Sequence, residues 1–519
     1  MRSPHRRLAT TLATCLLLAA GAAQAPVFAQ FNAPTPSSAV PPPSLLPALG
    51  DGGGMSLPAE RRLGDMIARQ IYRDPDYLDD PVLADYVQRI WQRLMASARA
   101  RGELSIELED TFAWDIALGR DRTVNAFALP GGYLGVHLGL MAVVSSEDEL
   151  ASVLAHELSH VTQRHISRLM TQQSTTGPLM IGAMILGALA ASRNPGAAGA
   201  LIGGGQAVAI QGQLNFSRDM EREADRVGFG IMTQAGFEPQ GFVGMFEKLQ
   251  QANRFNDTGA FPYLRSHPLT TERIADMQQR QSLMPRASVA PMTMLHALMA
   301  ARARALGINT IDNQRTYTAL AASPNNNPPA MQAGVLYAAV LAHMNLREFP
   351  QALTTWQALN KLTAKADVPS QELVRFLGVE LSMASGDLTQ AQDFAAAKNR
   401  LNLSQRATLF LWAQAAIRTG RAKEASEQLQ TWLATRARDA SAWQLLAQAY
   451  TAQNQTLSAV RADAEAHAAH LDFAAAVNRL KAAQDLMRQS TQVDHIEASI
   501  IDTRTRQFES KLREQALER

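Results

Sequence analysis

The sequence predicts a mainly α-helical protein that carries a small β-sheet in its first half and an α-solenoid of helical repeats in its second half. Three observations lead to this fold class. The chain has 519 residues, more than one hydrophobic core usually organises, so several domains are expected. Residues 59–285 mix helical periodicity with short alternating runs. Residues 291–515 are rich in Ala, Leu and Gln and keep a helical period throughout.

The composition excludes several classes of protein. Hydrophobic residues make up 46% of the chain and charged residues 18%, which fits a globular protein and not a disordered one. Lys and Arg number 49 against 47 for Asp and Glu, so the net charge of +2 gives no basic footprint for nucleic acid. Cys15 is the single cysteine. A metal site must therefore use histidine and carboxylate ligands.

Residues 1–29 have the three parts of a secretory signal peptide. Arg2, Arg6 and Arg7 precede an uncharged, apolar stretch, and small residues follow it. We expect cleavage after Ala29 and hence export of the mature chain. An uncleaved membrane anchor is the alternative, although the apolar run is shorter than the roughly 18 residues that a membrane span needs.

The next two segments differ in composition, which predicts a flexible leader followed by a folded segment. Residues 30–58 contain seven prolines and a run of three glycines, which predicts a flexible leader. Within 59–285 we expect helices over 61–72 and 81–98 and β-like runs at 104–109 and 133–137. The stretch at 125–137 is interpreted as a loop, a Gly-Gly turn and the second of these strands.

The second half repeats with a period of 34 residues. A turn residue followed by alanine recurs, so that Ala391, Ala425 and Ala459 are 34 residues apart. Less regular copies end at Ala352 and Ala476. This is the period of tetratricopeptide helix pairs, whose stacked units form a concave protein-binding surface. An unrelated bundle of Ala-rich helices is the alternative.

The strongest chemical signal is a His-Glu-x-x-His motif at residues 156–160, inside an apolar, helix-like run. On a helix, residues four apart are separated by about 40° around the axis, so His156 and His160 leave one face and can share a tetrahedral zinc ion. Glu157 lies beside them, as a general base in metal-assisted hydrolysis would. Because such a pentapeptide also occurs by chance, the chain must supply a third ligand.

Two candidates for that ligand were weighed by their helical positions. His165 would lie about 180° from His156 on a continuous helix, which makes it a surface or supporting residue. Further along, Glu221 and Asp225 are four residues apart and share a face, while Glu223 points elsewhere. Glu221 could ligate zinc while Asp225 accepts a hydrogen bond from a ligand histidine and fixes its tautomer. A solvated, charged helix face is the alternative.

These motifs resemble the gluzincin metallopeptidases of the Ste24, HtpX and Oma1 type. Two further sequence motifs also match this family. They are Asn-Ala-Phe-Ala-Leu-Pro-Gly-Gly-Tyr at 125–133 and Ser-His-Pro-Leu at 266–269. The order of signal peptide, catalytic domain (59–285) and repeat domain (291–515) is similar to that of the periplasmic BepA branch. The resemblance thus covers nearly all of the mature chain.

The resemblance implies one Zn²⁺ per chain, held by His156, His160 and Glu221. Glu157 is then the base, and Asp225 supports the ligands. A fourth, regulatory ligand is also implied, because His267 lies on a loop that can reach the metal and close the site until that loop moves. The alternative is that this His-Pro segment merely ends a loop.

Other expectations concern the surroundings of the site. Arg218 is a candidate supporting residue that could stabilise charge on the reacting substrate, and Arg273 could hold the His267 loop. The strand at 133–137 is expected at the edge of the cleft, where a substrate could add as a further strand; an ordinary internal strand is the alternative. Residues 177–210 are expected to touch a membrane or a client, or simply to pack.

The resemblance implies two functions of different classes. The first is a zinc-dependent endopeptidase of the Gram-negative periplasm that degrades misfolded or stalled envelope and outer-membrane proteins. Its repeat domain would dock clients or the outer-membrane assembly machinery. The second is a periplasmic chaperone or scaffold for outer-membrane protein assembly whose protease is latent.

Overall fold

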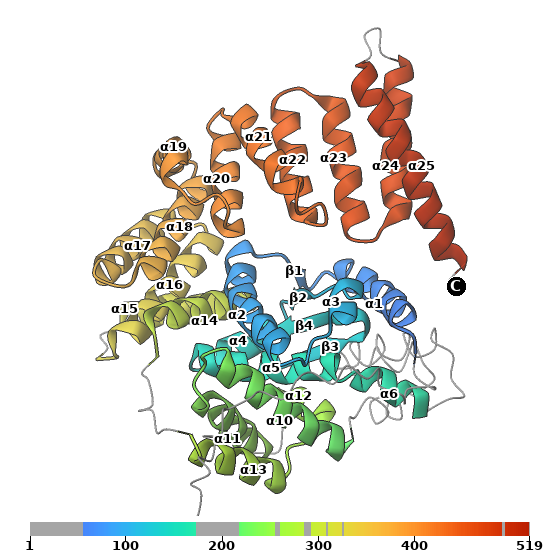
Figure 1. Ribbon diagram of the computed structural model, residues 1–519. Helices are drawn as coiled ribbons and strands as arrows, with labels where there is room; N and C mark the ends of the chain where they lie inside the picture. The colour runs from blue at the N-terminus through green and yellow to red at the C-terminus, as the bar shows by residue number, and fades with distance from the viewer. Residues whose placement is uncertain are drawn as a thin grey trace, which may run out of the picture. The chain divides into compact units, whose positions relative to one another are not determined.

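The computed structural model describes residues 55–172, 217–254, 260–284, 292–307, 310–323, 326–489 and 494–517, which belong to one compact unit (Figure 1). The predicted signal peptide, most of the predicted leader and the segment 177–210 lie outside these ranges. The leader ends earlier than predicted, because helix α1 begins at Leu57 and contains Pro58 in its first turn. Proline fits there since its missing N–H would have no partner in the helix.

The first part of the described chain surrounds a small sheet with helices. Its elements are α1 (Leu57–Tyr72), β1 (Tyr77–Leu78), α2 (Pro81–Ala100), α3 (Ile106–Thr111), β2 (Asp115–Gly119), β3 (Ala126–Leu129), the 3-10 turn η1 (Pro130–Gly132), β4 (Tyr133–His137), α4 (Leu138–Val143), α5 (Glu147–Thr162), α6 (His165–Gln172), α10 (Arg218–Gln234), α11 (Gln240–Arg254), α12 (Tyr263–Ser266) and α13 (Thr271–Ser282).

The sheet has the strand order β1-β2-β4-β3. Strands β2 and β4 run parallel, and β1 and β3 pair antiparallel on the two outer sides. The predicted strand at 133–137 is therefore internal, and the expectation that it forms the edge is wrong. Strand β3 takes the edge, joined to β4 by a turn in which Gly131 and Gly132 both have positive φ. Its alanines are weak strand formers, which is why the sequence indicated a loop.

Residues 104–109 also differ from the prediction, because they enter helix α3 and not a strand. The apolar residues alternate here as in a strand, but Ser105 accepts a hydrogen bond from the backbone N–H of Leu108 and caps a helix. Ile106 is then left 78% exposed. The local cap thus outweighs the alternating pattern.

Helix α5 is the centre of this part. Its residues from Glu149 to Val161 are all buried, because α2, α10, α11 and strand β3 pack against it. Gly228 on α10 lies against the α5 backbone, and a Cβ at this position would be 3.0 Å from the carbonyl oxygen of Ala155. The missing side chain lets α10 approach α5 closely.

The second part of the described chain is entirely helical. Its elements are α14 (Met294–Gly307), α15 (Ile311–Ala322), α16 (Pro329–Asn345), α17 (Phe349–Thr363), α18 (Val368–Ser385), α19 (Thr389–Ala396), the 3-10 turn η2 (Lys398–Arg400), α20 (Arg406–Arg418), α21 (Ala422–Leu433), α22 (Ala440–Ala452), α23 (Thr456–Ala469), α24 (Phe473–Gln489) and α25 (His495–Leu517).

These helices form pairs, and from α16 onward each packs against the next along the chain (Figure 1). Turn residues with positive φ recur every 34 residues, at Gly386, Gly420 and Asn454. The repeated alanines are buried on the helices that follow these turns, and they are Ala391, Ala425 and Ala459. The mainly helical class with a small sheet is thus confirmed. The assignment of the pairs to tetratricopeptide repeats stays a prediction.

The two parts meet at helix α2, against which α14 and α20 pack. Asp80, which caps α2, lies 2.6 Å from Arg302 of α14. Its neighbour Asp79 lies 2.6 Å from Arg406 of α20. Adjacent aspartates of the first part therefore each hold an arginine of the second.

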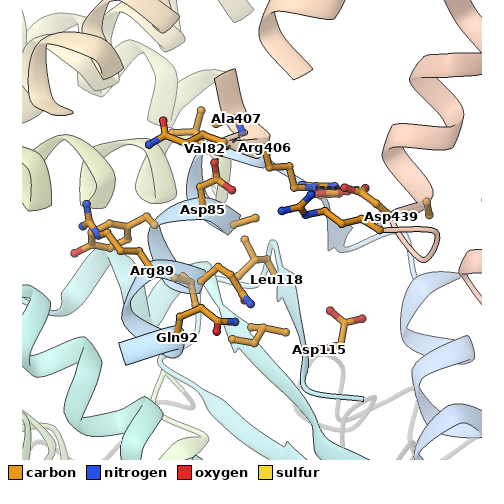
Figure 2. Close-up of a pocket in the computed structure, with 18 of the residues that line it drawn as sticks. Val82, Asp85, Arg89, Gln92, Asp115, Leu118, Arg406, Ala407 and Asp439 are labelled. Carbon is orange, nitrogen blue, oxygen red and sulfur yellow. Dashed lines mark hydrogen bonds and ion pairs between the residues drawn. The ribbon is translucent and has the colours of Figure 1, made fainter. Parts of the chain in front are cut away.

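A cavity of about 760 Å³ lies at this junction, lined mainly by α2, β2, α18, α20 and the residues before α22. Figure 2 shows Asp85 on the α2 side, next to Ala407, and Arg406 reaching Asp439 on the repeat side. The walls thus carry both acidic and basic groups. None of the helices in the described ranges combines the length and the apolar character needed to cross a membrane.

Candidate metal centre

Helix α5 carries the two histidines of the motif. It begins after Ser146, whose hydroxyl accepts a hydrogen bond from the N–H of Glu149, and its first turn is acidic. His156 and His160 leave the same face and are both buried, with their Nε2 atoms 3.0 Å apart. The predicted geometry of the pair is therefore present.

Helix α10 supplies the carboxylates. Ser217 caps this helix, because its hydroxyl accepts a hydrogen bond from the backbone N–H of Met220. The side chains of Glu221 and Asp225 are buried and face α5. Glu221 lies 3.5 Å from the Nε2 atoms of both motif histidines.

His267 is the fourth member of the cluster. It follows the short helix α12 and stacks on the ring of Tyr263, with centroids 4.5 Å apart. Its Nδ1 lies 3.3 Å from His156 Nε2 and 3.0 Å from a carboxylate oxygen of Glu221. The loop thus places this histidine inside the site, as the resemblance implied.

The four groups fit a metal ion. Their ligand atoms, from His156, His160, Glu221 and His267, all lie within 4.8 Å of one another and are buried. Ligand atoms about 2.0–2.1 Å from a tetrahedral zinc ion lie roughly 3.3–3.4 Å apart. The observed separations of 3.0–3.5 Å bracket that value. Two imidazole nitrogens and a carboxylate that converge in this way suit a Zn²⁺ ion.

Glu157 lies beside the cluster in a position to accept a proton. One carboxylate oxygen accepts a hydrogen bond from the N–H of Ala128 on edge strand β3, at 2.9 Å. The other, Oε1, is buried without a hydrogen bond among the described residues and lies 3.4 Å from His267 Nε2. Burial raises the pKa of Glu157 above its ordinary value, which makes it a stronger base than an exposed carboxylate.

A buried ion-pair network supports His156. Its Nδ1 lies 3.0 Å from Asp225, which in turn receives two hydrogen bonds from Arg273, at 2.6 and 2.8 Å. Arg273 also lies 2.7 Å from Glu221 and donates to the carbonyl of Pro268, the residue after His267. One arginine therefore holds a predicted ligand, its supporting carboxylate and the histidine loop.

The pKa values of several site residues are shifted because ionisable groups are buried close together. Burial alone would lower the pKa of His156, but the carboxylates of Asp225 and Glu221 outweigh it and raise the pKa to about 9. Burial and the charge of His156 lower the pKa of His160. Burial would raise the pKa of Asp225, but Arg273 outweighs it and holds the pKa below its ordinary value.

Arg218 is not part of this network. Its side chain is exposed at the first residue of α10, and its role toward a bound substrate stays a prediction. The buried place beside the carboxylates is taken by Arg273, which reaches them from α13. The sequence indicated Arg273 only as a holder of the loop, because nothing in its spacing relates it to α10.

His165 is the residue whose place sequence reasoning missed most. The prediction assumed one continuous helix, but α5 ends at Thr162, and Arg164 turns the chain with a positive φ. Helix α6 then begins at His165, which is buried with its Nδ1 2.9 Å from Nδ1 of His160. Glu223, predicted to point away, lies 3.1 Å from the other nitrogen of His165. No glycine or proline marks this break in the sequence.

Comparison with known proteins agrees with this geometry. The sequence profile of peptidase family M48 matches residues 81–281. The putative beta-barrel assembly-enhancing protease of Vibrio cholerae is 34% identical over 320 residues, which cover 61% of this chain and 63% of the relative. The beta-barrel assembly-enhancing protease of Escherichia coli is 30% identical over 429 residues, which cover 82% of this chain and 83% of the relative.

A mitochondrial relative is more distant. The mitochondrial metalloendopeptidase OMA1 of Saccharomyces cerevisiae is 26% identical over 236 residues, which cover 43% of this chain and 64% of the relative.

The similarity to the bacterial proteases extends well beyond the profile match at 81–281. The alignment to the Escherichia coli relative is therefore too long to be confined to the first part of the chain.

Proposed function

Because the chain belongs to peptidase family M48, we propose that it is a zinc-dependent endopeptidase that degrades misfolded or stalled proteins of the Gram-negative envelope, including outer-membrane proteins. The observation that carries the proposal is the buried cluster of His156, His160, Glu221 and His267, with Glu157 beside it. The names of the relatives, which are beta-barrel assembly-enhancing proteases, support the substrate class.

The site residues divide the work of hydrolysis. A zinc ion held by His156, His160 and Glu221 would act as a Lewis acid toward the scissile carbonyl and acidify a water molecule. Glu157 accepts the proton of the attacking water at Oε1 and can return it to the leaving amine. The N–H of Ala128 holds the other oxygen of Glu157 and so keeps its carboxylate aimed at the site.

The substrate would bind at the edge of the sheet. Strand β3 is the edge strand and is joined to Glu157 through Ala128. An extended peptide that adds to this edge is held by main-chain hydrogen bonds, which depend little on sequence. This mode suits unfolded clients with many different sequences.

The repeat half would dock clients or the outer-membrane assembly machinery. The regular helix pairs and the cavity of about 760 Å³ at the junction with α2 support this role (Figure 2). Its walls offer both apolar side chains such as Leu118 and charged ones such as Arg89 and Asp115. A surface of this kind can contact varied protein segments.

A periplasmic chaperone or scaffold with a latent protease is a second candidate, and the place of His267 favours it. This histidine lies between Glu157 and Glu221, where the water and the scissile carbonyl would have to enter. Hydrolysis therefore requires the loop that carries His267 to move away. In the arrangement described, the site is closed.

Export to the periplasm, with one Zn²⁺ per chain, completes the proposal. The signal-like sequence at 1–29 and the Gram-negative relatives support this compartment. Loss of Cys15 with the signal peptide would leave no cysteine in the mature chain, which suits an oxidising compartment.

The test is a Glu157→Gln variant of the mature protein. It removes the proton acceptor and keeps all predicted ligands, so zinc content measured by mass spectrometry should stay at one per chain. Cleavage of an unfolded reporter protein should fall by at least 10²-fold, as for the loss of a general base. Wild-type protein treated with a chelator should lose the same activity. Full cleavage by the variant would refute the assignment of the base, and chelator-resistant cleavage would refute the metallopeptidase proposal.

A further inference from the structure

We infer that His165 and Glu223 position the predicted ligand His160, as a second support separate from the one at His156. The inference rests on the proposed zinc site. His165 Nδ1 lies 2.9 Å from His160 Nδ1, on the side of that ring away from the cluster. His165 Nε2 lies 3.1 Å from Glu223. The side chains of Glu223, His165 and His160 therefore form a continuous series of hydrogen bonds that ends at the cluster.

The direction of these hydrogen bonds follows from the chemistry of imidazole. A neutral histidine carries one N–H, so His160 can offer a lone pair from Nε2 only if its proton is on Nδ1. That Nδ1–H donates to Nδ1 of His165. The proton of His165 is then on Nε2 and donates to Glu223. A reversed chain would put a proton on His160 Nε2 and prevent ligation.

Glu223 is itself fixed by a second residue of α6. Arg168 of α6 donates to the same carboxylate oxygen at 2.9 Å. Helix α6 therefore contributes both His165 and the arginine that orients the acceptor at the end of the chain. The turn at Arg164, which starts α6, is held by hydrogen bonds to Glu60 and Ser167.

The two motif histidines are oriented in the same way, but by different residues. His156 is oriented by Asp225, which Arg273 holds. His160 is oriented by His165, which Glu223 and Arg168 hold. Hydrogen bonding of this kind fixes the ring and its tautomer and raises the basicity of the ligand.

The test compares zinc affinity, by competition with a chromophoric chelator, in three variants of the mature protein. His165→Leu removes the acceptor and should weaken zinc binding about 10–100-fold. His165→Asn keeps an acceptor near the Nδ1 position and should recover part of that loss. Glu223→Gln changes only the partly exposed end of the chain and should weaken binding less. The absorption spectrum of the cobalt-substituted protein should shift in His165→Leu, because the His160 ring is no longer held.

The matched control is His296→Leu. His296 is equally buried but lies on α14, bonded to Tyr86 and the carbonyl of Val144. It should lower the thermal midpoint of the metal-free protein and leave zinc affinity unchanged.

Four results would overturn the inference. Zinc affinity of His165→Leu within twofold of wild type would do so, and so would an equal loss in the His296→Leu control. If His165→Leu does not fold, wild-type affinity and cobalt spectrum in Glu223→Gln would count against the inference. Absence of zinc binding by the wild-type protein would overturn the proposed function together with it.

Discussion

The predicted ligands are held by partners on other helices. His156 and His160 belong to one turn of α5, yet Asp225 orients the first and His165 contacts the second. A buried imidazole without such partners could rotate or take the wrong tautomer. The position of each nitrogen is therefore set by the neighbouring residues as much as by the motif.

At this scale, His267→Ala should raise basal cleavage of an unfolded reporter several-fold. The substitution removes the ring that lies between Glu157 and Glu221, and three predicted ligands remain to hold zinc. Cleavage rate and zinc content are measured on the same preparation.

Ser266→Ala provides the comparison on the same loop. Within the described ranges its hydroxyl donates only to the carbonyl of Tyr263, so the activity of this variant should stay at the wild-type level. An unchanged or lower rate in His267→Ala, with zinc retained, would show that this histidine does not block the site.

At the scale of elements, the site depends on how closely α10 approaches α5. Gly228 lies one turn beyond Asp225, and a Cβ there would meet the backbone of Ala155 and His156 at 3.0–3.1 Å. Contacts of that length leave little room for even one methyl group, and none for a branched side chain.

Gly228→Leu should therefore push α10 away and lower zinc affinity by at least tenfold, because Glu221 and Asp225 move with the helix. Arg226→Leu places the same side chain on the exposed face of the same helix and should leave zinc binding unchanged. Chelator competition measures both. Equal affinities in the two variants would mean that the close helix contact is not needed for the site.

At the scale of the whole molecule, ion pairs join the repeat half to α2. Arg406 lies between Asp79 and Asp439, and Arg302 lies between Asp80 and Glu380. Breaking a buried pair leaves an uncompensated charge and typically costs about 3–5 kcal/mol. These contacts therefore couple the unfolding of the two halves.

The Asp79 pair should make stability depend on pH. Burial would raise the pKa of Asp79, but Arg406 outweighs it and holds the pKa below its ordinary value. A carboxylate with a lowered pKa in the folded state stabilises the fold above the pKa of the unfolded chain, about 3.9. That stabilisation is lost as the pH falls through the lower, folded pKa. Urea unfolding of metal-free Asp79→Asn should give a lower midpoint than wild type at pH 7, and the difference should shrink below about pH 4.

Asp485→Asn is the control for this prediction. Asp485 is exposed on α24, and its one ion pair among the residues that the structure describes is with Arg488, three residues away. Its midpoint should follow that of the wild type at every pH. A gap between Asp79→Asn and wild type that stays constant down to about pH 2 would contradict the role of this carboxylate.

Sequence patterns within single segments were enough to predict much of the fold and of the site. The helix period placed His156 and His160 on one face and Glu221 and Asp225 on another, because residues four apart on a helix are neighbours whatever surrounds them. The repeated alanines likewise indicated the paired helices of the second half, since small residues are needed where helices approach closely.

The tertiary structure decided what depends on contacts between distant segments. The edge position of β3 and the entry of Arg273 from α13 depend on such contacts. The return of His165 to His160 spans only five residues, but it depends on the break at Arg164, which no local period records. The break at Arg164 is stabilised by Glu60, more than a hundred residues earlier. The sequence by itself therefore determined which residues could bind a metal, and only the fold determined how they are oriented, because orientation comes from neighbours that are far away along the chain.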